Sequence, residues 1–376
     1  MSDQRSPVTD GELTIFLAAP PGLEPWLLEE ARELGLTKPR AVPGGVECTG
    51  QWADVWRANL WLRGASRVLV RLGSFRAAHL STLDKRSRTL PWESVLTPGT
   101  TISVEATCRA SKIYHSGAAA ERVRKAAIAK AGVAFDKGGG AKIFVRIEKD
   151  ICTVSLDTSG ELLHKRGYKQ SVVKAPLRET MAALFLHAAG FSGQEPLIDP
   201  MCGSGTIPLE AALWSRGLAP GRDRHFAFER LATFDADVCE AMRRETPTTN
   251  TVNTVIGADR NGAAIEASRQ NAERAGLSDV VQFRHQPLSQ LERPEGPPGL
   301  VMINPPYGER IGDRRELTAL YASIGSVMRD RFTGWRAAIV TSDAKLAKAT
   351  GLPFKQPGPP VPHGPLRVRL YQTDPL

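Results

Sequence analysis

Residues 300–307 place hydrogen-bond acceptors and an aromatic ring directly after a short apolar run. Proline has no backbone N–H, so Pro305 and Pro306 end a buried strand and make Asn304 the start of a rigid loop. The side-chain carbonyl of Asn304 and the backbone carbonyl of Pro305 then form a fixed pair of acceptors, with Tyr307 as a flat wall beside them. At the carboxyl edge of an open α/β sheet, where ligands bind, this set could receive the exocyclic amine of a planar base.

Residues 197–206 contain a second loop suited to a ligand, in which a strand breaks at glycines before a helix. Glycine lets the backbone approach a ligand closely, and the helix directs its first N–H groups at it. A dinucleotide loop would need a third glycine where this chain has Pro208, and an acid about 20 residues later. The best acid at a strand end, Asp259, lies 54 residues beyond Gly205. Asp199 would repel a pyrophosphate but attract the ammonium of a methionine moiety, which favours S-adenosylmethionine.

The Asn-Pro-Pro-Tyr stretch resembles the catalytic motif of S-adenosylmethionine-dependent amino-methyltransferases that act on nucleobases. Residues 304–310 are more narrowly similar to the RNA guanine-N2 methyltransferases that carry a THUMP domain, including bacterial enzymes for 23S ribosomal RNA. The resemblance implies S-adenosylmethionine as the cofactor and the N2 of a guanosine as the methyl acceptor. It assigns the catalytic role to Asn304, Pro305, Pro306 and Tyr307.

The same resemblance outlines the cofactor site. Asp199 would hold the amino-acid end of the cofactor, and Asp259 would accept its ribose hydroxyls. The family usually has an acid for the adenine amine after the third strand, whereas this chain has Gln286, whose carbonyl can accept the same bond. His363-Gly364 likewise replaces the Asn-Gly turn usual in the family. The expected cofactor-binding residues are Asp199, Cys202, Gly203, Ser204, Gly205, Thr206, Asp259, Gln286 and Asn304.

Length and composition are those of a globular protein. A chain of 376 residues favours two or three domains, and 41% hydrophobic with 24% charged residues can bury a core. No apolar run reaches the roughly 18 residues needed to span a bilayer, and we expect neither a signal peptide nor an anchor. Five dispersed cysteines without paired spacing favour reduced thiols, a cytoplasmic location and no metal site. We also expect a monomer.

Positive charge is concentrated in the middle of the sequence. Residues 1–56 hold 4 Lys and Arg against 9 Asp and Glu, residues 57–149 hold 18 against 6, and residues 150–376 hold 27 against 25. The three segments therefore carry net charges of −5, +12 and +2. A strongly basic middle segment predicts a polyanionic partner.

Two small α+β domains are predicted before residue 160. Strand and helix patterns alternate over residues 10–65, as in a ferredoxin-like domain. Residues 66–160 continue with half-buried strands and a basic helix at about 117–130. The residues just before this helix are similar to the THUMP domain, an RNA-binding module, which implies RNA as the partner. The expected RNA contacts are Ser111, Lys112, Tyr114, His115 and Arg122.

Residues 161–376 are predicted to form the methyltransferase domain, with the α/β fold class and a doubly wound, Rossmann-like sheet. A helix is expected from Ala175 to Gly190, with proline in its first turn. The polar insertion at residues 217–253 is expected to form a lobe beside the site. The later strands are predicted at residues 255–259, 280–284, up to 304, 337–341 and, antiparallel, 366–371.

Several alternatives stay open or are disfavoured. An adenine-N6 methyltransferase would use the same Asn-Pro-Pro-Tyr residues, and transfer RNA is an alternative to ribosomal RNA. The missing third glycine disfavours an oxidoreductase. An RNA-binding protein without catalysis would have no use for Asp199, Asp259 and Asn304 together.

Overall fold

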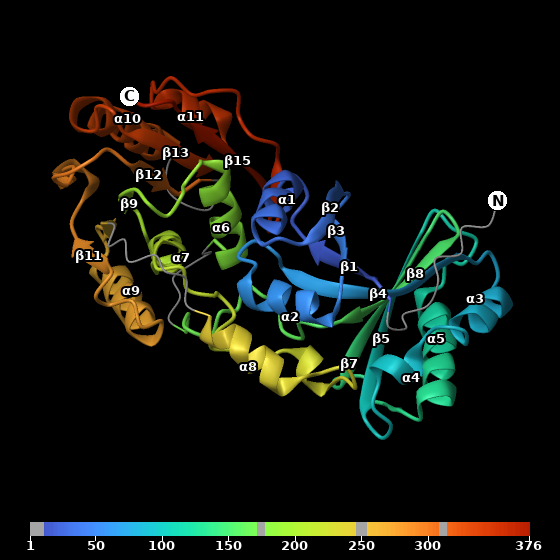
Figure 1. Cartoon of the computed structure of the whole chain (residues 1–376). Coiled ribbons are helices and arrows are strands. Elements are labelled where there is room, and N and C mark those ends of the chain that lie inside the picture. Colours follow the sequence, from blue (N-terminus) through green and yellow to red (C-terminus); the bar gives the residue numbers. More distant parts are fainter. Residues whose placement is uncertain (1–10, 171–176, 246–253, 308–313) are drawn as a thin grey trace. The chain divides into compact units, whose positions relative to one another are not determined.

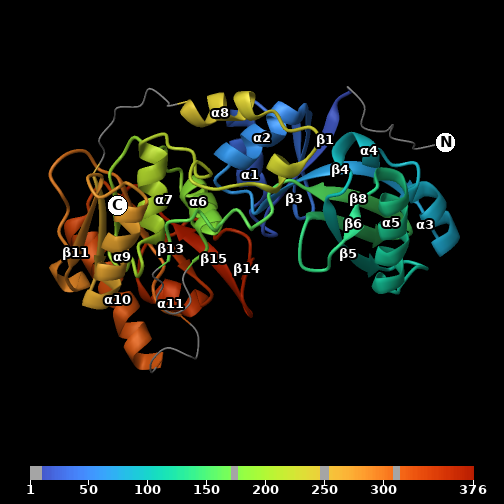
Figure 2. The ribbon, with the colours of Figure 1, turned by 90° about the horizontal axis from the view of Figure 1, so that it is seen from below.

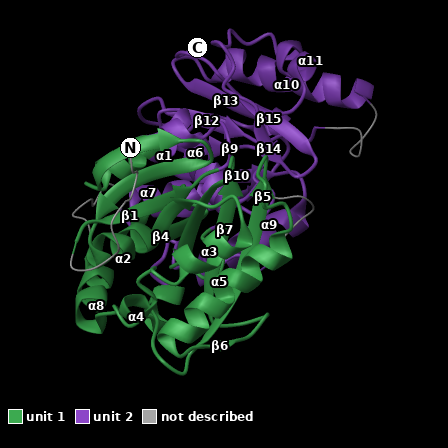
Figure 3. Ribbon diagram, turned by 90° about the vertical axis from the view of Figure 1, so that its right-hand side faces the viewer, with its two compact units in different colours: residues 1–19, 28–163, 224–245 green, residues 20–27, 164–223, 246–376 purple. Residues whose placement is uncertain are grey.

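The computed structural model falls into two compact units. The residues that it describes are 11–170, 177–245, 254–307 and 314–376. Unit 1 comprises residues 1–19, 28–163 and 224–245, and unit 2 comprises residues 20–27, 164–223 and 246–376 (Figure 3). The first two residues of the expected helix at 175–190 and residues 308–310 of the extended motif lie outside the described residues.

The described part of unit 1 is built on a mixed sheet of eight strands in the order β2-β3-β1-β4-β8-β7-β5-β6 (Figure 1). Strand β4 pairs with both β1 and β8, so the expected ferredoxin-like and THUMP-like segments share one sheet. The strands are β1 (Leu13–Ala18), β2 (Thr37–Val42), β3 (Gly45–Gly50), β4 (Arg67–Arg76), β5 (Thr101–Arg109), β6 (Ala134–Phe135), β7 (Ala141–Glu148) and β8 (Ile151–Asp157). The helices of the same region, with α1 crossing into unit 2, are α1 (Glu24–Glu33), α2 (Trp52–Trp61), α3 (Leu80–Ser87), α4 (Trp92–Val95), α5 (Ser116–Ala131), η1 (Ala227–Arg230) and α8 (Ala236–Arg244).

The insertion at residues 217–253, expected to form a lobe beside the site, is divided: residues 217–223 belong to unit 2, and residues 246–253 lie outside the described residues. Residues 224–245 belong to unit 1, because their aromatic side chains pack into it. The ring of Trp56 on α2 lies 6.3 Å from that of Phe228 and 6.0 Å from that of Phe234. Because this segment is mostly polar, its sequence pattern does not indicate that its aromatic side chains pack into unit 1.

The described part of unit 2 is built on a sheet of seven strands in the order β11-β10-β9-β12-β13-β15-β14. In this order, each strand from β11 through β10, β9 and β12 to β13 is parallel to its neighbour. Strand β15 pairs antiparallel with β13, as expected. The strands are β9 (Leu197–Asp199), β10 (Val255–Asp259), β11 (Val281–His285), β12 (Leu300–Ile303), β13 (Arg336–Thr341), β14 (Val361–His363) and β15 (Leu366–Gln372). The helices are α6 (Glu179–Ala188), α7 (Thr206–Ser215), α9 (Gly262–Arg274), η2 (Leu288–Gln290), α10 (Arg314–Arg331) and α11 (Ala344–Ala349).

Helices cover both faces of this sheet, which confirms the doubly wound, Rossmann-like fold. Helices α7 and α10 lie on opposite sides of the strands (Figure 1 and Figure 2). All four residues of β12 are buried, and two of them, Val301 and Ile303, share a core with residues of α10 that include Tyr321, Ile324 and Met328. Strand β12 stops at Ile303 because a proline at position 305 cannot donate to the ladder.

A buried ionic cluster joins the start of unit 2 to α7. The carboxylate of Glu210 accepts hydrogen bonds from Arg166 Nε at 3.2 Å and Nη2 at 3.1 Å, and from the Tyr168 hydroxyl at 3.0 Å. The side chains of Arg166 and Glu210 are only 2% and 0% exposed. Burial and the neighbouring carboxylate of Glu210 raise the pKa of Tyr168 well above its usual value, so its hydroxyl remains a donor.

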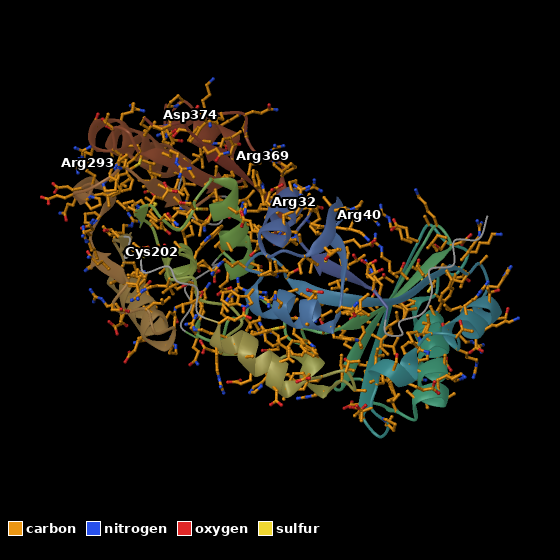
Figure 4. The ribbon with its side chains drawn as sticks, in the orientation of Figure 1. Arg32, Arg40, Cys202, Arg293, Arg369 and Asp374 are labelled. Atoms are coloured by element: carbon orange, nitrogen blue, oxygen red, sulfur yellow. The ribbon has the colours of Figure 1, made fainter. Side chains whose placement is uncertain are left out.

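We predict that Glu210→Gln lowers the free energy of unfolding by about 3–5 kcal/mol, because it leaves the Arg166 charge buried without its counter-ion. The free energy of unfolding of each variant would be measured by urea denaturation, followed by a signal from unit 2. Asp374→Asn is the matched control, since Asp374 pairs with Lys355 at 2.6 Å on the surface (Figure 4) and should contribute less than about 1 kcal/mol. Equal losses in the two variants would contradict the assignment.

Candidate active site

Four predicted site residues lie at one edge of the sheet in unit 2. They follow or end four strands that run parallel, so their side chains gather at the carboxyl ends, where α/β proteins bind ligands. Asp199 and Asp259 are the last residues of β9 and β10, and Gln286 and Asn304 directly follow β11 and β12. The structure therefore brings the two predicted loops together although they are about 100 residues apart in the chain.

A cavity of about 660 Å³ opens at this edge. Asp259 and Asn304 both line it, together with Pro306, and the side chains of Leu320 and Val327 on α10 form another wall. Its volume is within the range of small-molecule and cofactor sites. One cavity thus touches a residue predicted to hold the cofactor and a residue predicted to hold the acceptor amine.

The glycine loop between β9 and α7 adopts the conformation expected of it. Gly203 and Gly205 have φ angles of 55° and 83°, which favour glycine. The amide of Gly205 donates to the Cys202 carbonyl at 2.8 Å, and the amide of Cys202 donates to the Ala258 carbonyl at 2.9 Å. A Cβ at position 205 would lie 3.1 Å from Phe283 and from Ser268, so a side chain there would crowd the loop.

Asp259 holds the glycine loop and the next helix at the same time. Its Oδ2 accepts the Gly203 amide at 3.0 Å, and its Oδ1 accepts the Asn261 amide at 2.8 Å. Each carboxylate oxygen has a further lone pair, so both can still accept a hydroxyl hydrogen. Asp259 can therefore hold the glycine loop and accept ribose hydroxyls at the same time.

Asp199 is a carboxyl in an apolar setting. It is 1% exposed, and its Oδ1 accepts the Met201 amide at 3.0 Å. Burial, with a smaller contribution from the nearby carboxylate of Asp259, raises the pKa of Asp199 well above its usual value. A positively charged group placed beside it would favour the ionised form and be bound in return.

Polar side chains that the sequence reasoning missed brace the loop from below. Ser268 Oγ lies 2.8 Å from the Gly203 carbonyl, and Asn271 Nδ2 donates to the Ser204 carbonyl at 3.0 Å. These two residues are three positions apart on α9 and are fully buried. Polar residues at that spacing could have been recognised as a buried helix face aimed at the loop.

Lys169 is a second brace that was not predicted. Its Nζ donates to Thr206 Oγ1 at 2.6 Å and to the Leu177 carbonyl at 3.2 Å, and it pairs with Glu179 at 3.2 Å. Thr206 is the first residue of α7, so Lys169 fixes the point at which the glycine loop becomes helix. Thr206, one of the predicted cofactor residues, is thereby engaged by the protein itself.

Two other predicted loop residues are buried. Burial and the charges of two nearby aspartates raise the pKa of the Cys202 thiol well above its usual value, so it is neutral at physiological pH (Figure 4). The hydroxyl of Ser204 is buried, and it has no hydrogen-bond partner among the residues that the structure describes. Cys202 thus fills space, while Ser204 retains a polar atom for a ligand.

Asn304 carries an unsatisfied acceptor. Its Oδ1 is buried and has no hydrogen-bond partner in the described part of the chain. None of the hydrogen bonds found there ends on the carbonyl of the neighbouring Pro305. A buried polar atom without a partner costs about 1–3 kcal/mol, so a ligand that donates to it is bound favourably.

The rest of the motif is anchored by two elements further along the chain. The Tyr321 hydroxyl on α10 lies 3.4 Å from the Pro306 carbonyl and donates to Thr341 Oγ1 at 3.0 Å. The Tyr307 hydroxyl lies 3.0 Å from Nδ1 of His363 on β14. Burial raises the pKa of Tyr307 to about 12, so it is a neutral phenol.

Gln286 presents a second orphaned group at the same edge. Its backbone amide donates to the Asp259 carbonyl at 3.1 Å, while its Nε2 is buried with no partner among the described residues. The two ends of an amide are assigned from their contacts, so either atom can face a ligand. An amide can pair with both a donor and an acceptor on adenine, which fits the position expected for the cofactor base.

The five predicted RNA contacts lie in unit 1, at the start of α5. Ser111 Oγ donates to the Arg109 carbonyl at 2.8 Å, and the Lys112 amide donates to Asp150 Oδ1 at 2.8 Å, so the turn is held against the β7–β8 hairpin. Tyr114 is 85% exposed. His115 caps α5, since its Nδ1 accepts the Ala118 amide at 3.0 Å. Arg122 is exposed about two turns into the helix.

The described ranges carry neither a membrane-spanning helix nor a metal-binding cluster. No helix there is both long enough and apolar enough to cross a bilayer. Those residues contain no group of three or more His, Cys, Asp or Glu side chains placed to hold a metal ion.

Two segments of the chain match models of known families. Residues 166–355 match the family model of the RMKL-like methyltransferase domain, and residues 14–69 match the RlmL ferredoxin-like domain. A curated relative from Syntrophotalea carbinolica, "Ribosomal RNA large subunit methyltransferase K/L", is 38% identical over 91% of this chain and 51% of that protein. The chain thus spans about half the length of the curated relatives it matches.

Solved structures match along the whole chain. The putative methyltransferase SMU.472, crystallised with S-adenosylhomocysteine (SAH), is 30% identical with a TM-score of 0.88 and covers 98% of this chain and 99% of its own. A predicted N6-adenine-specific DNA methylase from Listeria monocytogenes is 32% identical, also with a TM-score of 0.88, over 97% of each chain. Together with the family match to half of the sequence, these similarities show that the chain belongs to the family of RMKL-like methyltransferase domains.

Proposed function

We propose that the protein transfers a methyl group from S-adenosylmethionine to the exocyclic N2 of a guanosine in ribosomal RNA of the large subunit. The observation that carries this proposal is the buried, partnerless Oδ1 of Asn304 in a cavity that it shares with Asp259. Such an acceptor selects a ligand that brings an N–H into the site, as an exocyclic amine does.

The residues at the sheet edge fit S-adenosylmethionine, which supplies an electrophilic methyl group when bound. Asp199 would bind the ammonium group and Asp259 the ribose hydroxyls, and the two left-handed glycines would let the backbone pass closely. Gln286, whose Nε2 has no partner among the described residues, would pair with the adenine. The similar SMU.472 structure was solved with S-adenosylhomocysteine, the product of such a donor.

Asn304 and Pro305 would activate the acceptor by polarising its N–H bonds. The lone pair of guanine N2 is delocalised into the ring, so the amine is a poor nucleophile. Two acceptors that draw on its hydrogens raise the electron density on nitrogen and fix its direction, while Tyr307 stacks on the base. The proton can leave after transfer, so the site needs no strong general base.

An RNA substrate is supported by the basic segment and by the relatives. Residues 57–149 carry a net charge of +12, and Tyr114 is exposed in that segment for stacking on a base. We assign this role to the proposed THUMP-like domain at 66–160, beside a ferredoxin-like domain at 10–65 and a methyltransferase domain at 161–376. The relatives with the name "Ribosomal RNA large subunit methyltransferase K/L" favour ribosomal over transfer RNA.

The product distinguishes the proposal from its alternatives. We predict that protein incubated with methyl-labelled S-adenosylmethionine and ribosomal RNA, transfer RNA or duplex DNA labels ribosomal RNA, and that digestion releases N2-methylguanosine identified by mass. Undermodified ribosomal RNA should be the best substrate, because the base must leave its stack to reach the cavity. N6-methyladenine as the main product would contradict the assignment of guanosine as the acceptor. Label in transfer RNA alone would contradict the assignment of ribosomal RNA as the substrate.

The role assigned to Asn304 predicts that its substitution slows methyl transfer without weakening the binding of S-adenosylmethionine. Asn304→Ala should slow single-turnover methyl transfer roughly 100-fold, as expected for one oriented group in a preorganised site, and leave the Kd for S-adenosylmethionine almost unchanged. Asn271→Ala is the matched control. Because Asn271 supports the Ser204 carbonyl, its loss should act on the Kd instead. A variant at position 304 that keeps more than about a tenth of the rate would refute the role.

We predict that the carboxylate of Asp199 lowers the stability of the ligand-free protein but strengthens the binding of S-adenosylmethionine. Its pKa is raised in the folded protein, so its ionisation opposes folding at every pH above its ordinary value of 3.8. Asp199→Asn should therefore raise the Tm of the ligand-free protein at pH 7 but not at pH 3.5. It should also weaken S-adenosylmethionine binding roughly 10- to 100-fold, since the charge for the ammonium is gone. An unchanged Tm with unchanged affinity would contradict both assignments.

A further inference from the structure

The ring of Tyr307 is tied to a residue far along the chain. Its hydroxyl lies 3.0 Å from Nδ1 of His363, which is 56 positions later. Tyr307 belongs to the loop after β12, whereas His363 ends β14 in the hairpin that closes the sheet. Both side chains are half-buried. The contact therefore joins the loop predicted to bind the acceptor base to a separate part of unit 2.

The loop needs such a contact because of its own chemistry. Pro305 and Pro306 have no N–H groups, so two successive residues cannot hold the loop by donating backbone hydrogen bonds. Tyr321 approaches the Pro306 carbonyl and so restrains the main chain. The ring of Tyr307 is contacted at its hydroxyl end by His363.

The Tyr307 hydroxyl can donate this hydrogen bond. Burial keeps the Tyr307 phenol protonated, with a pKa of about 12. In the tautomer of His363 that carries its hydrogen on Nε2, Nδ1 accepts from the Tyr307 hydroxyl. An acceptor attached to Cγ is thus the feature that position 363 must supply.

We propose that His363 is a positioning residue, which holds the Tyr307 ring in the orientation that stacks on the acceptor base. The inference rests on the proposed base methylation. It deepens that function by naming a residue outside the Asn-Pro-Pro-Tyr motif that governs the rate of methyl transfer through Tyr307.

Substitutions at position 363 separate positioning from a merely structural role. Asparagine puts its Oδ1 on Cγ, at the place of Nδ1, whereas glutamine carries its amide one bond further out. With large-subunit ribosomal RNA and labelled S-adenosylmethionine, His363→Ala and His363→Gln should lower kcat about 5- to 10-fold, as for the loss of one neutral hydrogen bond. His363→Asn should keep at least about half of the rate, and the Kd for S-adenosylmethionine should stay within about twofold in all three. Equal rates for the Asn and Gln variants would overturn the proposal.

A double-mutant cycle tests whether His363 acts through Tyr307. Tyr307→Phe keeps the ring and removes the hydroxyl, so it should slow transfer about as much as His363→Ala does. The double variant should be no slower than either single variant, because both remove one shared bond. Losses that multiply in the double variant would show that His363 acts elsewhere and would refute the inference.

A spectroscopic readout keeps the inference separate from the proposed function. The chain has five tyrosines, so fluorotyrosine-labelled protein gives a simple fluorine NMR spectrum, in which Tyr307→Phe assigns the signal of Tyr307. His363→Ala and His363→Gln should shift that signal, and His363→Asn should leave it near its original place. A signal that none of the three changes would refute the contact. If wild-type protein methylates no RNA, the proposed function fails, while this spectrum still decides whether the contact orients the ring.

Discussion

Two prolines that cannot donate hydrogen bonds determine where the site begins. They end β12 after four buried residues, and they leave the Oδ1 of Asn304 beside a packed core with no partner among the residues that the structure describes. The cost of such a buried acceptor, about 1–3 kcal/mol, is offset only when a ligand donates to it. Gln286 follows β11 on the same sheet edge, and its buried Nε2 likewise has no partner within the described ranges. The folded protein therefore carries unsatisfied groups at the places where the two ligands of a methyl transfer would meet.

The remaining parts of unit 2 keep these groups in place. The glycine loop is held by backbone contacts to Asp259 and by polar side chains of α9 beneath it. Lys169 and the buried Arg166–Glu210 pair connect the start of the unit to α7. Charges buried in this way are costly unless every partner is present, so the loop has one well-defined arrangement. A preorganised loop spends little binding energy on ordering itself around a cofactor.

The sequence predicts the chemistry at the strand ends better than the contacts that support it. The strands around Asp199, Asp259 and Asn304 were found because buried parallel strands are short apolar runs, and because glycine and proline mark their ends. Ser268 and Asn271 were overlooked, since a polar residue on a helix is usually solvated, although their spacing puts both on one face of α9. The pair of Tyr307 and His363 is formed by folding across 56 residues, which no local pattern reveals. Strand β2 was missed because it is exposed, carries Pro39 and lacks alternation.

The most direct test of the account is whether Asn304 contacts the amine of the base. A synthetic stem-loop can carry either guanosine or inosine, which lacks the N2 amine, at the position that mass analysis finds methylated. Affinities of the wild-type protein and of Asn304→Ala for both RNAs would be measured in the presence of S-adenosylhomocysteine. If Asn304 accepts a hydrogen of that amine, inosine weakens binding to the wild-type protein and makes no difference to the variant. The same loss with inosine in both proteins would contradict the contact on which the account rests.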